Sequence, residues 1–308
     1  MKIAIVRLSA LGDIVFSAVC PALIKQKYKN AHITWIVDSR FEGVIADSPF
    51  VDEVVAISLK PLTLQNIAAG YKKLKNLGDF DIVLDLQGLV KSGLVAAALR
   101  SNTKVGYSYK SAREGIASCF YTKKVVSNYQ KNIVLRYIDL LNTAFDGGFD
   151  GQEVYGKPPI LGFRAKPKKS EKGRILVNMT ASKQNKIYPW ELMREALKEF
   201  DGYEIVVMGG EGDTVGFLGL DEVKGLISTC NLVVGGDTGI THLAWAMNIP
   251  SVTIFGATPS KRNTFETEKN ITVSALSDVD AKKLDYDDFA IKAIPPKEIA
   301  DAMRRVLC

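Results

Sequence analysis

An aspartate lies just beyond the first apolar run of the chain, where a catalytic group can be held. The segment Ser9-Ala10-Leu11-Gly12-Asp13 separates residues 3–6 from an amphipathic stretch. A carboxylate at the carboxyl end of a parallel strand can act as a general base toward a hydroxyl group. Spacing alone favours a capping role for Asp13 at a helix expected to begin at Ile14. Both roles stay open, and Asp13 is the candidate catalytic residue.

A glycine-rich loop that ends in a histidine forms the second candidate site. Residues 235–242 read G-G-D-T-G-I-T-H and follow the apolar run 232–234. Glycines let the backbone approach a ligand closely, and the start of a helix attracts anions. We therefore predict a diphosphate cradle in which His242 donates a hydrogen bond to phosphate. Asp237 would repel a diphosphate, so we expect it to cap the helix or to accept a bond from a sugar hydroxyl.

Two further loops carry groups that suit a nucleotide. Residues 180–186, T-A-S-K-Q-N-K, follow an apolar run and offer hydroxyl groups and Lys186 to phosphate oxygens. Residues 208–213, M-G-G-E-G-D, follow another apolar run. Glu211 or Asp213 can bind ribose hydroxyls there, and a plain glycine-rich turn is an equal alternative.

The motifs do not point to a metal site or to a cofactor. The chain has two histidines, and its four cysteines are scattered without a C-x-x-C pair. One D-x-D pair, at 79–81, precedes its strand, and the other, at 278–280, lies in a diffuse acidic tract. Residues 88–92 lack the first glycine of a P-loop, and loop 9–13 lacks the G-x-G-x-x-G of dinucleotide-binding enzymes. We expect no metal and no cofactor.

The elements that hold these loops alternate between short apolar runs and longer amphipathic stretches. Strands are expected at 3–6, 33–37, 54–57, 82–84 and 104–107, and helices at 14–28, 62–77 and 89–99. A second series has strands at 175–178, 204–208, 232–234 and 252–255, and helices near 190–200, 221–229 and 238–247. This alternation predicts an α/β fold of two Rossmann-like, doubly wound parallel-sheet domains that face a central cleft.

A stretch rich in Gly, Pro and Lys, at 146–172, separates the two series. We assign 1–160 to an N-terminal domain, 161–172 to a linker, 173–295 to a C-terminal domain and 296–308 to a last helix. The chain has 308 residues, 47% of them hydrophobic and 24% charged, which suits two globular domains. No apolar run reaches membrane-spanning length, the start does not resemble a signal peptide, and the scattered cysteines favour a reducing cytosol.

The net charge of +6 is unevenly distributed. Residues 104–136 contain seven Lys or Arg against one acid, and residues 164–186 contain eight against one. Such clusters suit a polyanionic partner, namely phosphates, an anionic membrane surface or a nucleic acid. For the second cluster a solvated basic linker is the favoured interpretation.

At these loops the sequence resembles glycosyltransferase family 9. The matching segments are S-A-L-G-D (9–13), D-L-Q-G-L-V-K-S-G (85–93), S-A-R-E-G-I-A-S-C-F-Y (111–121) and G-D-T-G-I-T-H (236–242). The resemblance implies the two-domain GT-B fold and a metal-independent, inverting reaction. It implies transfer of L-glycero-D-manno-heptose from ADP-heptose to a Kdo residue of Kdo-lipid A, in the inner core of lipopolysaccharide.

The resemblance also assigns roles to individual residues. It places the catalytic carboxylate on Asp13 and the acceptor in the N-terminal domain, with acceptor-binding cations at Lys60, Lys91 and Arg113. It places ADP-heptose in the C-terminal domain. The expected donor-binding residues are Ala181, Ser182, Lys186, Glu211, Leu218, Asp237, Thr238, Gly239 and His242. Ala181 and Ser182 replace a threonine pair common in relatives, and segment 209–220 is short, so the adenine and ribose contacts differ from the family pattern.

The expected location is the cytoplasmic face of the inner membrane, where the protein is peripheral. The first basic cluster, interleaved with Tyr107, Tyr109, Phe120, Tyr121 and Tyr129, is the expected contact with the anionic lipid. Three rivals remain. One is a sister enzyme that adds the second heptose or another core sugar, and one is an NAD-dependent oxidoreductase. The third, a nucleic-acid-binding protein, lacks a recognition motif, so no nucleic acid is expected as partner.

Overall fold

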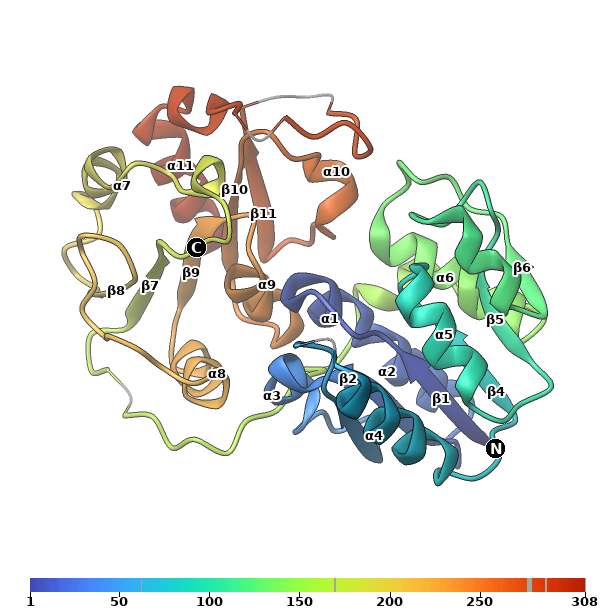
Figure 1. Cartoon of the computed structure of the whole chain (residues 1–308). Helices are drawn as coiled ribbons and strands as arrows, with labels where there is room; N and C mark the ends of the chain where they lie inside the picture. Colours follow the sequence, from blue (N-terminus) through green and yellow to red (C-terminus); the bar gives the residue numbers. More distant parts are fainter. Residues whose placement is uncertain (62, 169, 276–278, 286, 308) are drawn as a thin grey trace. The chain divides into compact units, whose positions relative to one another are not determined.

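The computed structural model describes residues 1–308 except 62, 169, 276–278, 286 and 308. The chain divides into two compact units, Met1–Gly162 and Phe163–Cys308 (Figure 1). Four residues of the features described above lie outside the described residues: Leu62 of the expected helix 62–77, Lys169 of the second basic cluster, Asp278 of the second D-x-D pair, and the cysteine Cys308.

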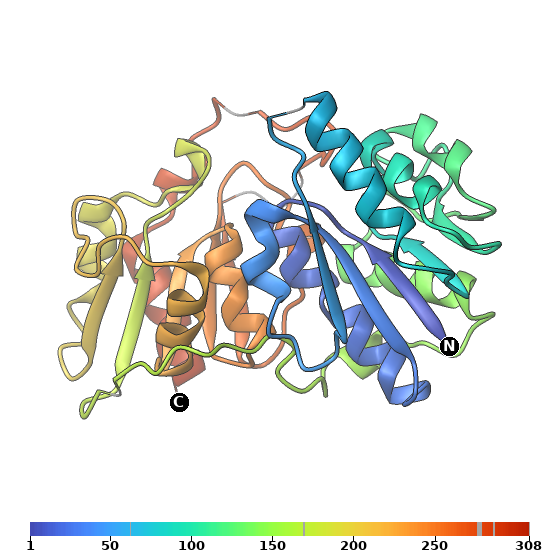
Figure 2. The ribbon, with the colours of Figure 1, turned by 60° about the horizontal axis from the view of Figure 1, so that its bottom comes forward.

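The first unit is built on a six-stranded parallel sheet (Figures 1 and 2). Its strands are β1 (Lys2–Val6), β2 (His32–Asp38), β3 (Glu53–Ile57), β4 (Ile82–Asp85), β5 (Lys104–Tyr107) and β6 (Lys123–Val125). Their order across the sheet is β3-β2-β1-β4-β5-β6. The expected strands agree with β1–β5 to within a residue or two, because runs buried on both faces are continuous in apolar residues. β6 was not expected, since only one of its three residues is buried.

Helices cover both faces of this sheet. They are α1 (Leu11–Ser17), α2 (Val19–Lys27), α3 (Glu42–Ile45), α4 (Leu64–Lys75), α5 (Val90–Ala98) and α6 (Ile133–Ala144), with short 3-10 turns at Ser39–Phe41, Gly115–Phe120 and Gly151–Val154. Val6 and Leu8 share a core cluster with Leu74 of α4 and with Val95 of α5. α6 contacts β4, β5 and β6 as well as α1 and α2, and was not among the expected helices.

The single helix expected at 14–28 is wrong in two respects. The structure has α1 from Leu11 and α2 from Val19, with Ala18 between them. Pro21 gives the physical reason for the break, because a proline ring inside a helix clashes with the carbonyl four residues earlier, here that of Ser17. The early start puts Asp13 in the third helical position, so it is not the N-cap residue; that position belongs to Ala10.

The second unit has a five-stranded parallel sheet. Its strands are β7 (Arg174–Asn178), β8 (Glu204–Met208), β9 (Leu232–Gly236), β10 (Ser251–Phe255) and β11 (Asn270–Ser274), in the order β11-β10-β9-β7-β8. Its helices are α7 (Trp190–Leu197), α8 (Leu220–Ser228), α9 (Gly239–Ala246), α10 (Ser260–Asn263) and α11 (Pro296–Leu307), with 3-10 turns at Gln184–Lys186 and Ala290–Ala293. The last helix, α11, packs against α7 and strands β9–β11, where Ile299 and Met303 join the core.

Strand order decides where each unit can hold a ligand. In parallel sheets of this kind, ligands bind beyond the carboxyl ends of the strands, where the order reverses direction. The reversal falls between β1 and β4 in the first unit and between β7 and β9 in the second. We call these places the first and the second switch point. In the described parts of the chain, no helix combines the length and the apolar character needed to cross a bilayer.

Candidate active site

The first switch point is organised by Arg7, the first residue after β1. Its side chain is only 6% exposed. Nη2 lies 2.8 Å from Oδ2 of Asp13, and Nη1 donates a 2.7 Å hydrogen bond to the carbonyl of Leu86. The guanidinium thus joins the end of β1, the first turn of α1 and the end of β4. Charge-assisted bonds of this kind are the strong ones in proteins, so they fix the geometry of the loop.

Asp13 keeps half of its carboxylate available. Oδ2 accepts from Arg7 and, at 3.4 Å, from the backbone N–H of Ala10. Within the described residues no hydrogen bond to Oδ1 is found, and the side chain is 47% exposed. An oriented carboxylate with one open oxygen has the geometry that a general base needs. The expected capping role survives in part, because Oδ2 does reach the N–H of Ala10.

The loop after β4 interlocks with the loop after β1. Gln87 accepts the N–H of Leu8 at 2.9 Å and donates to Oγ of Ser9 at 3.2 Å. Lys91 Nζ also donates to Ser9 Oγ, at 3.0 Å. The structure therefore brings Lys91, a residue of α5, to the segment that carries Asp13.

A buried carboxylate holds the Gln87–Lys91 segment from below. Asp85 is fully buried; Oδ1 accepts the N–H groups of Gln87 and Gly88, and Oδ2 accepts the hydroxyl of Tyr121 at 2.7 Å. Burial raises the pKa of Asp85, although these hydrogen bonds oppose the rise. The sequence motifs contained Asp85 and Tyr121, but sequence reasoning did not assign this supporting role to either residue.

The three expected acceptor-binding cations come from different segments of the first unit: Lys60 and Arg113 from loops, and Lys91 from the first turn of α5. Burial lowers the pKa of Lys91; Asp38 opposes this effect, while Arg40, Lys60 and Arg7 add to it. The positive charge of Lys60 is thus one of the charges that act on Lys91. Arg113 is exposed, and the next residue, Glu114, accepts the N–H of Val90 at the start of α5.

The second switch point is organised by Asp237, which is 6% exposed. Oδ2 lies 2.7 Å from Lys186 Nζ and accepts the hydroxyl of Thr258 at 2.8 Å, while Oδ1 lies 2.9 Å from Nε2 of His242. Burial by itself raises the pKa of Asp237, but the charge of Lys186 and the bond from His242 outweigh it and hold that pKa well below its usual range.

One expectation for this loop is wrong: Asp237 does not cap the helix, because the N-cap residue of α9 is Thr238 and no side chain caps it there. The physical reason is burial, since a buried carboxylate needs partners and Asp237 finds them in Lys186, Thr258 and His242. His242 is buried and its Nε2 is engaged by Asp237, and its expected hydrogen bond to phosphate stays a prediction. Thr258, which follows β10 as Asp237 follows β9, is a member of the network that sequence reasoning missed.

Glycines let the backbones of the two neighbouring loops touch. A Cβ at Gly236 would collide with the carbonyl oxygen of Lys186, and one at Gly235 would lie 2.6 Å from the carbonyl oxygen of Asn178. Asn178, the last residue of β7, donates from Nδ2 to the hydroxyls of Thr238 and Thr241. Lys186 and the start of α9 are thus held together, which is the arrangement an anion requires.

The remaining donor positions form a rim around this network. Ser182 and Glu211 are exposed, and Ala181, Leu218 and Gly239 are half-buried. The segment with Glu211 bends through Gly209 and Gly210, whose φ angles of 77° and 72° favour glycine. Asp213 accepts the N–H groups of Val215 and Gly216, so it closes the turn. Of the two acids considered for ribose, Glu211 is the one that such bonds leave available.

The first basic cluster does not form one surface. Tyr107, Tyr121 and Arg136 are buried, and Arg136 lies 4.3 Å from the centre of the Tyr107 ring. Lys131 pairs with Asp139 and Lys123 with Asp146. Of the aromatic residues expected at a lipid surface, Tyr107 and Tyr121 belong to the core of the first unit, Phe120 and Tyr129 are half-buried, and Tyr109 is exposed.

Groups of three or more potential metal ligands of the His, Cys, Asp and Glu type are not found in the part of the chain that the structure describes. Of the first D-x-D pair, Asp79 forms an ion pair with Arg100, and Asp81 accepts the N–H of Lys2. Both contacts lie at the amino end of β4, away from the switch point.

Comparison with known proteins adds a family to this geometry. The model of glycosyltransferase family 9 (heptosyltransferase) matches residues 68–215 and 213–292. Lipopolysaccharide heptosyltransferase 1 of Campylobacter coli is 33% identical, and the alignment covers 99% of each chain. The enzyme of the same name from Escherichia coli K12 is 24% identical over 84% of this chain and 88% of its own.

Solved structures share the fold. E. coli heptosyltransferase WaaC with ADP superposes with a TM-score of 0.81 at 19% identity, covering 99% of this chain and 100% of the other. E. coli ADP-heptose lps heptosyltransferase II gives a TM-score of 0.72 at 19% identity, covering 100% and 98%. At this identity the likeness concerns the fold, and it agrees with the expected GT-B architecture.

Proposed function

Since the chain belongs to glycosyltransferase family 9 and is a glycosyltransferase, we propose that it transfers L-glycero-D-manno-heptose from ADP-heptose to a Kdo residue of Kdo-lipid A. This is the heptosyltransferase I reaction of lipopolysaccharide inner-core synthesis. Support comes from the relative of that name at 33% identity over nearly the full length of both chains. Family membership also removes the NAD-dependent oxidoreductase from consideration.

The donor belongs at the second switch point in this proposal. The observation that carries it is the buried Asp237 that holds Lys186 beside the start of α9. A diphosphate there accepts hydrogen bonds from Lys186, from the hydroxyl of Ser182 and from free N–H groups at Thr238 and Gly239. Glu211 and Leu218 bind the ribose and adenine on the rim, with Ala181 lining the phosphate. His242 completes the cradle, with its Nε2 held by Asp237.

The acceptor belongs at the first switch point. Oδ1 of Asp13 takes the proton from a Kdo hydroxyl as its oxygen bonds to the anomeric carbon of heptose. The bond from that carbon to the diphosphate oxygen breaks in the same displacement, so the configuration inverts. Lys60, Lys91 and Arg113 bind the anionic groups of the acceptor.

The leaving ADP needs charge stabilisation, which a metal supplies in many enzymes. Here Lys186, Ser182 and the positive end of α9 supply it, and we propose that no metal is required. The acceptor is a lipid, so we place the protein on the cytoplasmic face of the inner membrane, bound peripherally to anionic lipid.

The test is a transfer assay with ADP-heptose and two acceptors, Kdo-lipid A without heptose and the same acceptor with one heptose. Product with the first acceptor alone supports the proposal. Product only with the second acceptor would reassign the chain to the heptosyltransferase II reaction, whose E. coli enzyme also shares the fold. Anomeric analysis of the product reports inversion or retention.

A further inference from the structure

A row of apolar side chains is exposed along α4 in the first unit. Leu64 is 87% exposed, Ile67 49% and Tyr71 53%. Their spacing of three and four residues puts them on one face of the helix. Leu74 is the only buried residue of α4. Single exposed apolar residues are common on protein surfaces, but a continuous row of them marks an interaction surface.

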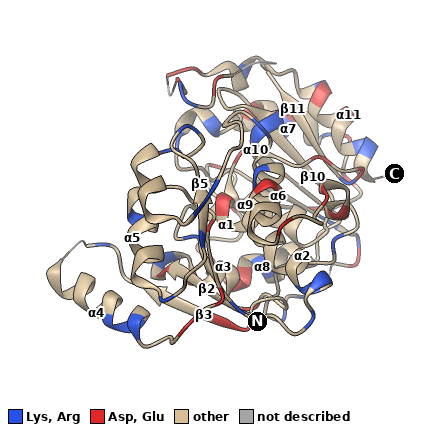
Figure 3. Cartoon of the chain, turned by 90° about the vertical axis from the view of Figure 1, so that its right-hand side faces the viewer, with Lys and Arg blue, Asp and Glu red and all other residues tan. Residues whose placement is uncertain are grey.

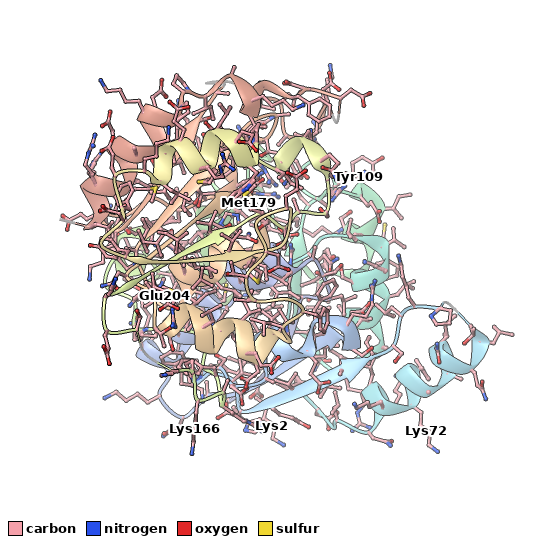
Figure 4. All side chains as sticks on the ribbon, turned by 90° about the vertical axis from the view of Figure 1, so that its left-hand side faces the viewer. Lys2, Lys72, Tyr109, Lys166, Met179 and Glu204 are labelled. Atoms are coloured by element: carbon pink, nitrogen blue, oxygen red, sulfur yellow. The ribbon has the colours of Figure 1, made fainter. Side chains whose placement is uncertain are left out.

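The segment that contains this row carries only positive charges. Residues 60–75 contain Lys60, Lys72, Lys73 and Lys75 and no acid. Lys73 Nζ donates a hydrogen bond to the carbonyl of Ala56. Lys75 Nζ lies 5.3 Å from the centre of the Tyr71 ring, beside the apolar row. Figure 3 shows α4 projecting at the edge of the first unit, and in Figure 4 the side chain of Lys72 points away from the ribbon.

We infer that α4 is the membrane-binding element of this protein: Leu64, Ile67 and Tyr71 enter the interface of an anionic bilayer, and Lys72 and Lys75 contact its headgroup phosphates. An apolar row bordered by lysines and by an aromatic residue with a polar tip is the pattern of helices that lie in a bilayer surface. The inference rests on the proposed function, because a lipid-borne acceptor requires an enzyme held at the membrane.

Charge complementarity favours lipid over a second copy of the chain. A two-fold contact through α4 would bring the same lysines of both copies together without an acid from this segment to pair with them. An anionic surface meets the same lysines with opposite charge. The residues of the first basic cluster are poorly placed for this task, since several of them are buried or paired.

The experiment is co-sedimentation of the full-length protein with phosphatidylethanolamine vesicles that contain or lack phosphatidylglycerol. We expect the parent to bind the anionic vesicles. The variant Leu64→Ser/Ile67→Ser/Tyr71→Ser should lose about tenfold or more of that binding. The variant Lys72→Glu/Lys75→Glu should also bind more weakly, and added salt should weaken the binding of the parent in the same way. The matched control is Val126→Ser/Phe217→Ser, which removes two apolar side chains that are 85% and 99% exposed elsewhere. The control should bind like the parent.

Two readouts keep this inference separate from the proposed function. With a deacylated, water-soluble Kdo acceptor, all these variants should match the parent in rate; failure of the parent on that acceptor would reject the function and not the surface. If the triple variant binds anionic vesicles as the parent does, α4 is not the membrane-binding element. If the parent is a dimer in solution and the triple variant a monomer, the row belongs to a second copy and the inference is overturned.

Discussion

Arg7 and Asp13 form an ion pair in which the cation is buried and the anion is half-exposed, with Nη2 and Oδ2 2.8 Å apart. The pair gives the carboxylate a fixed orientation and leaves its other oxygen for a substrate. A glycosyl transfer that depends on Asp13 therefore depends on Arg7 as well, although Arg7 itself is a positioning residue.

Replacing Asp13 tests the proposed base. Asp13→Asn keeps the shape and the contact with Arg7 but removes the proton acceptor, so kcat should fall by roughly 10²–10⁴ with little change in the KM for ADP-heptose. Steady-state kinetics measure both. Asp146→Asn, at an exposed ion pair with Lys123, is the control and should leave kcat unchanged. Near-normal turnover in Asp13→Asn would remove the carboxylate from the mechanism.

Replacing Arg7 tests the positioning role. Arg7→Met removes the bonds to Asp13 and to Leu86, and a displaced base should lower kcat by roughly 10- to 100-fold. Arg7→Lys restores a charge without the forked geometry, so its kcat should lie between that of the parent and that of Arg7→Met. Affinity for ADP, measured by calorimetry, should be unchanged in both. Equal losses of kcat and of ADP affinity would instead indicate general damage to the fold.

Replacing Lys186 tests the diphosphate cradle. A charge-assisted hydrogen bond contributes about 1.5–3 kcal/mol, so Lys186→Met should weaken ADP binding by roughly 10- to 150-fold. Lys198→Met, at an exposed lysine at the end of α7, should bind ADP normally. Calorimetric titration of both variants decides the point, and normal ADP affinity in Lys186→Met would disprove the assignment.

The stability of the protein should carry a signature of Asp237 in acid. Its pKa is lower in the folded protein than the ordinary 3.8, so the carboxylate contributes its full stabilisation above about pH 5 and progressively less as pH falls toward the folded-state pKa. Asp237→Asn should cost about 1–3 kcal/mol at pH 7, and the difference from the parent should shrink below pH 4. Urea unfolding of the parent and the variant at pH 7 and below pH 4 measures this difference in the free energy of unfolding. A difference that is the same at both would show that the charge is not the cause.

Removal of divalent metal tests the metal-free reaction. Because Lys186 and the start of α9 are proposed to neutralise the leaving ADP, dialysis against a chelator should leave the initial rate unchanged. The assay is repeated after Mg²⁺ is added back. A rate that disappears with chelation and returns with Mg²⁺ would require a metal at the diphosphate.

The parallel strands could be predicted closely because most of their residues are buried, and strands such as β1 and β8 carry four consecutive apolar residues. The short β6 and the half-buried β11 lack that signal. The helix after β1 was misplaced because apolar periodicity hides a break that Pro21 imposes.

The site residues divide in the same way. Lys186, Asp237 and His242 could be found because they follow glycines or small residues at the ends of strands. Their mutual bonds could not, since β7 and β9 become neighbours only through the strand order. Arg7 and Thr258 gave no motif. The sequence did contain a signal for each residue. For Arg7 it was a charge within an apolar run, and for Thr258 it was a hydroxyl in the loop after the next strand beyond Asp237.

Gly236, whose missing side chain lets β9 meet the carbonyl of Lys186, limits how this enzyme can be redesigned. A mutant library that seeks a different nucleotide sugar should recover only glycine at that position. Glu211 and Leu218, the proposed ribose and adenine contacts, are exposed and half-buried and lie away from this close contact. New donor specificities should therefore be selected through those two positions, with the phosphate-binding floor left as it is.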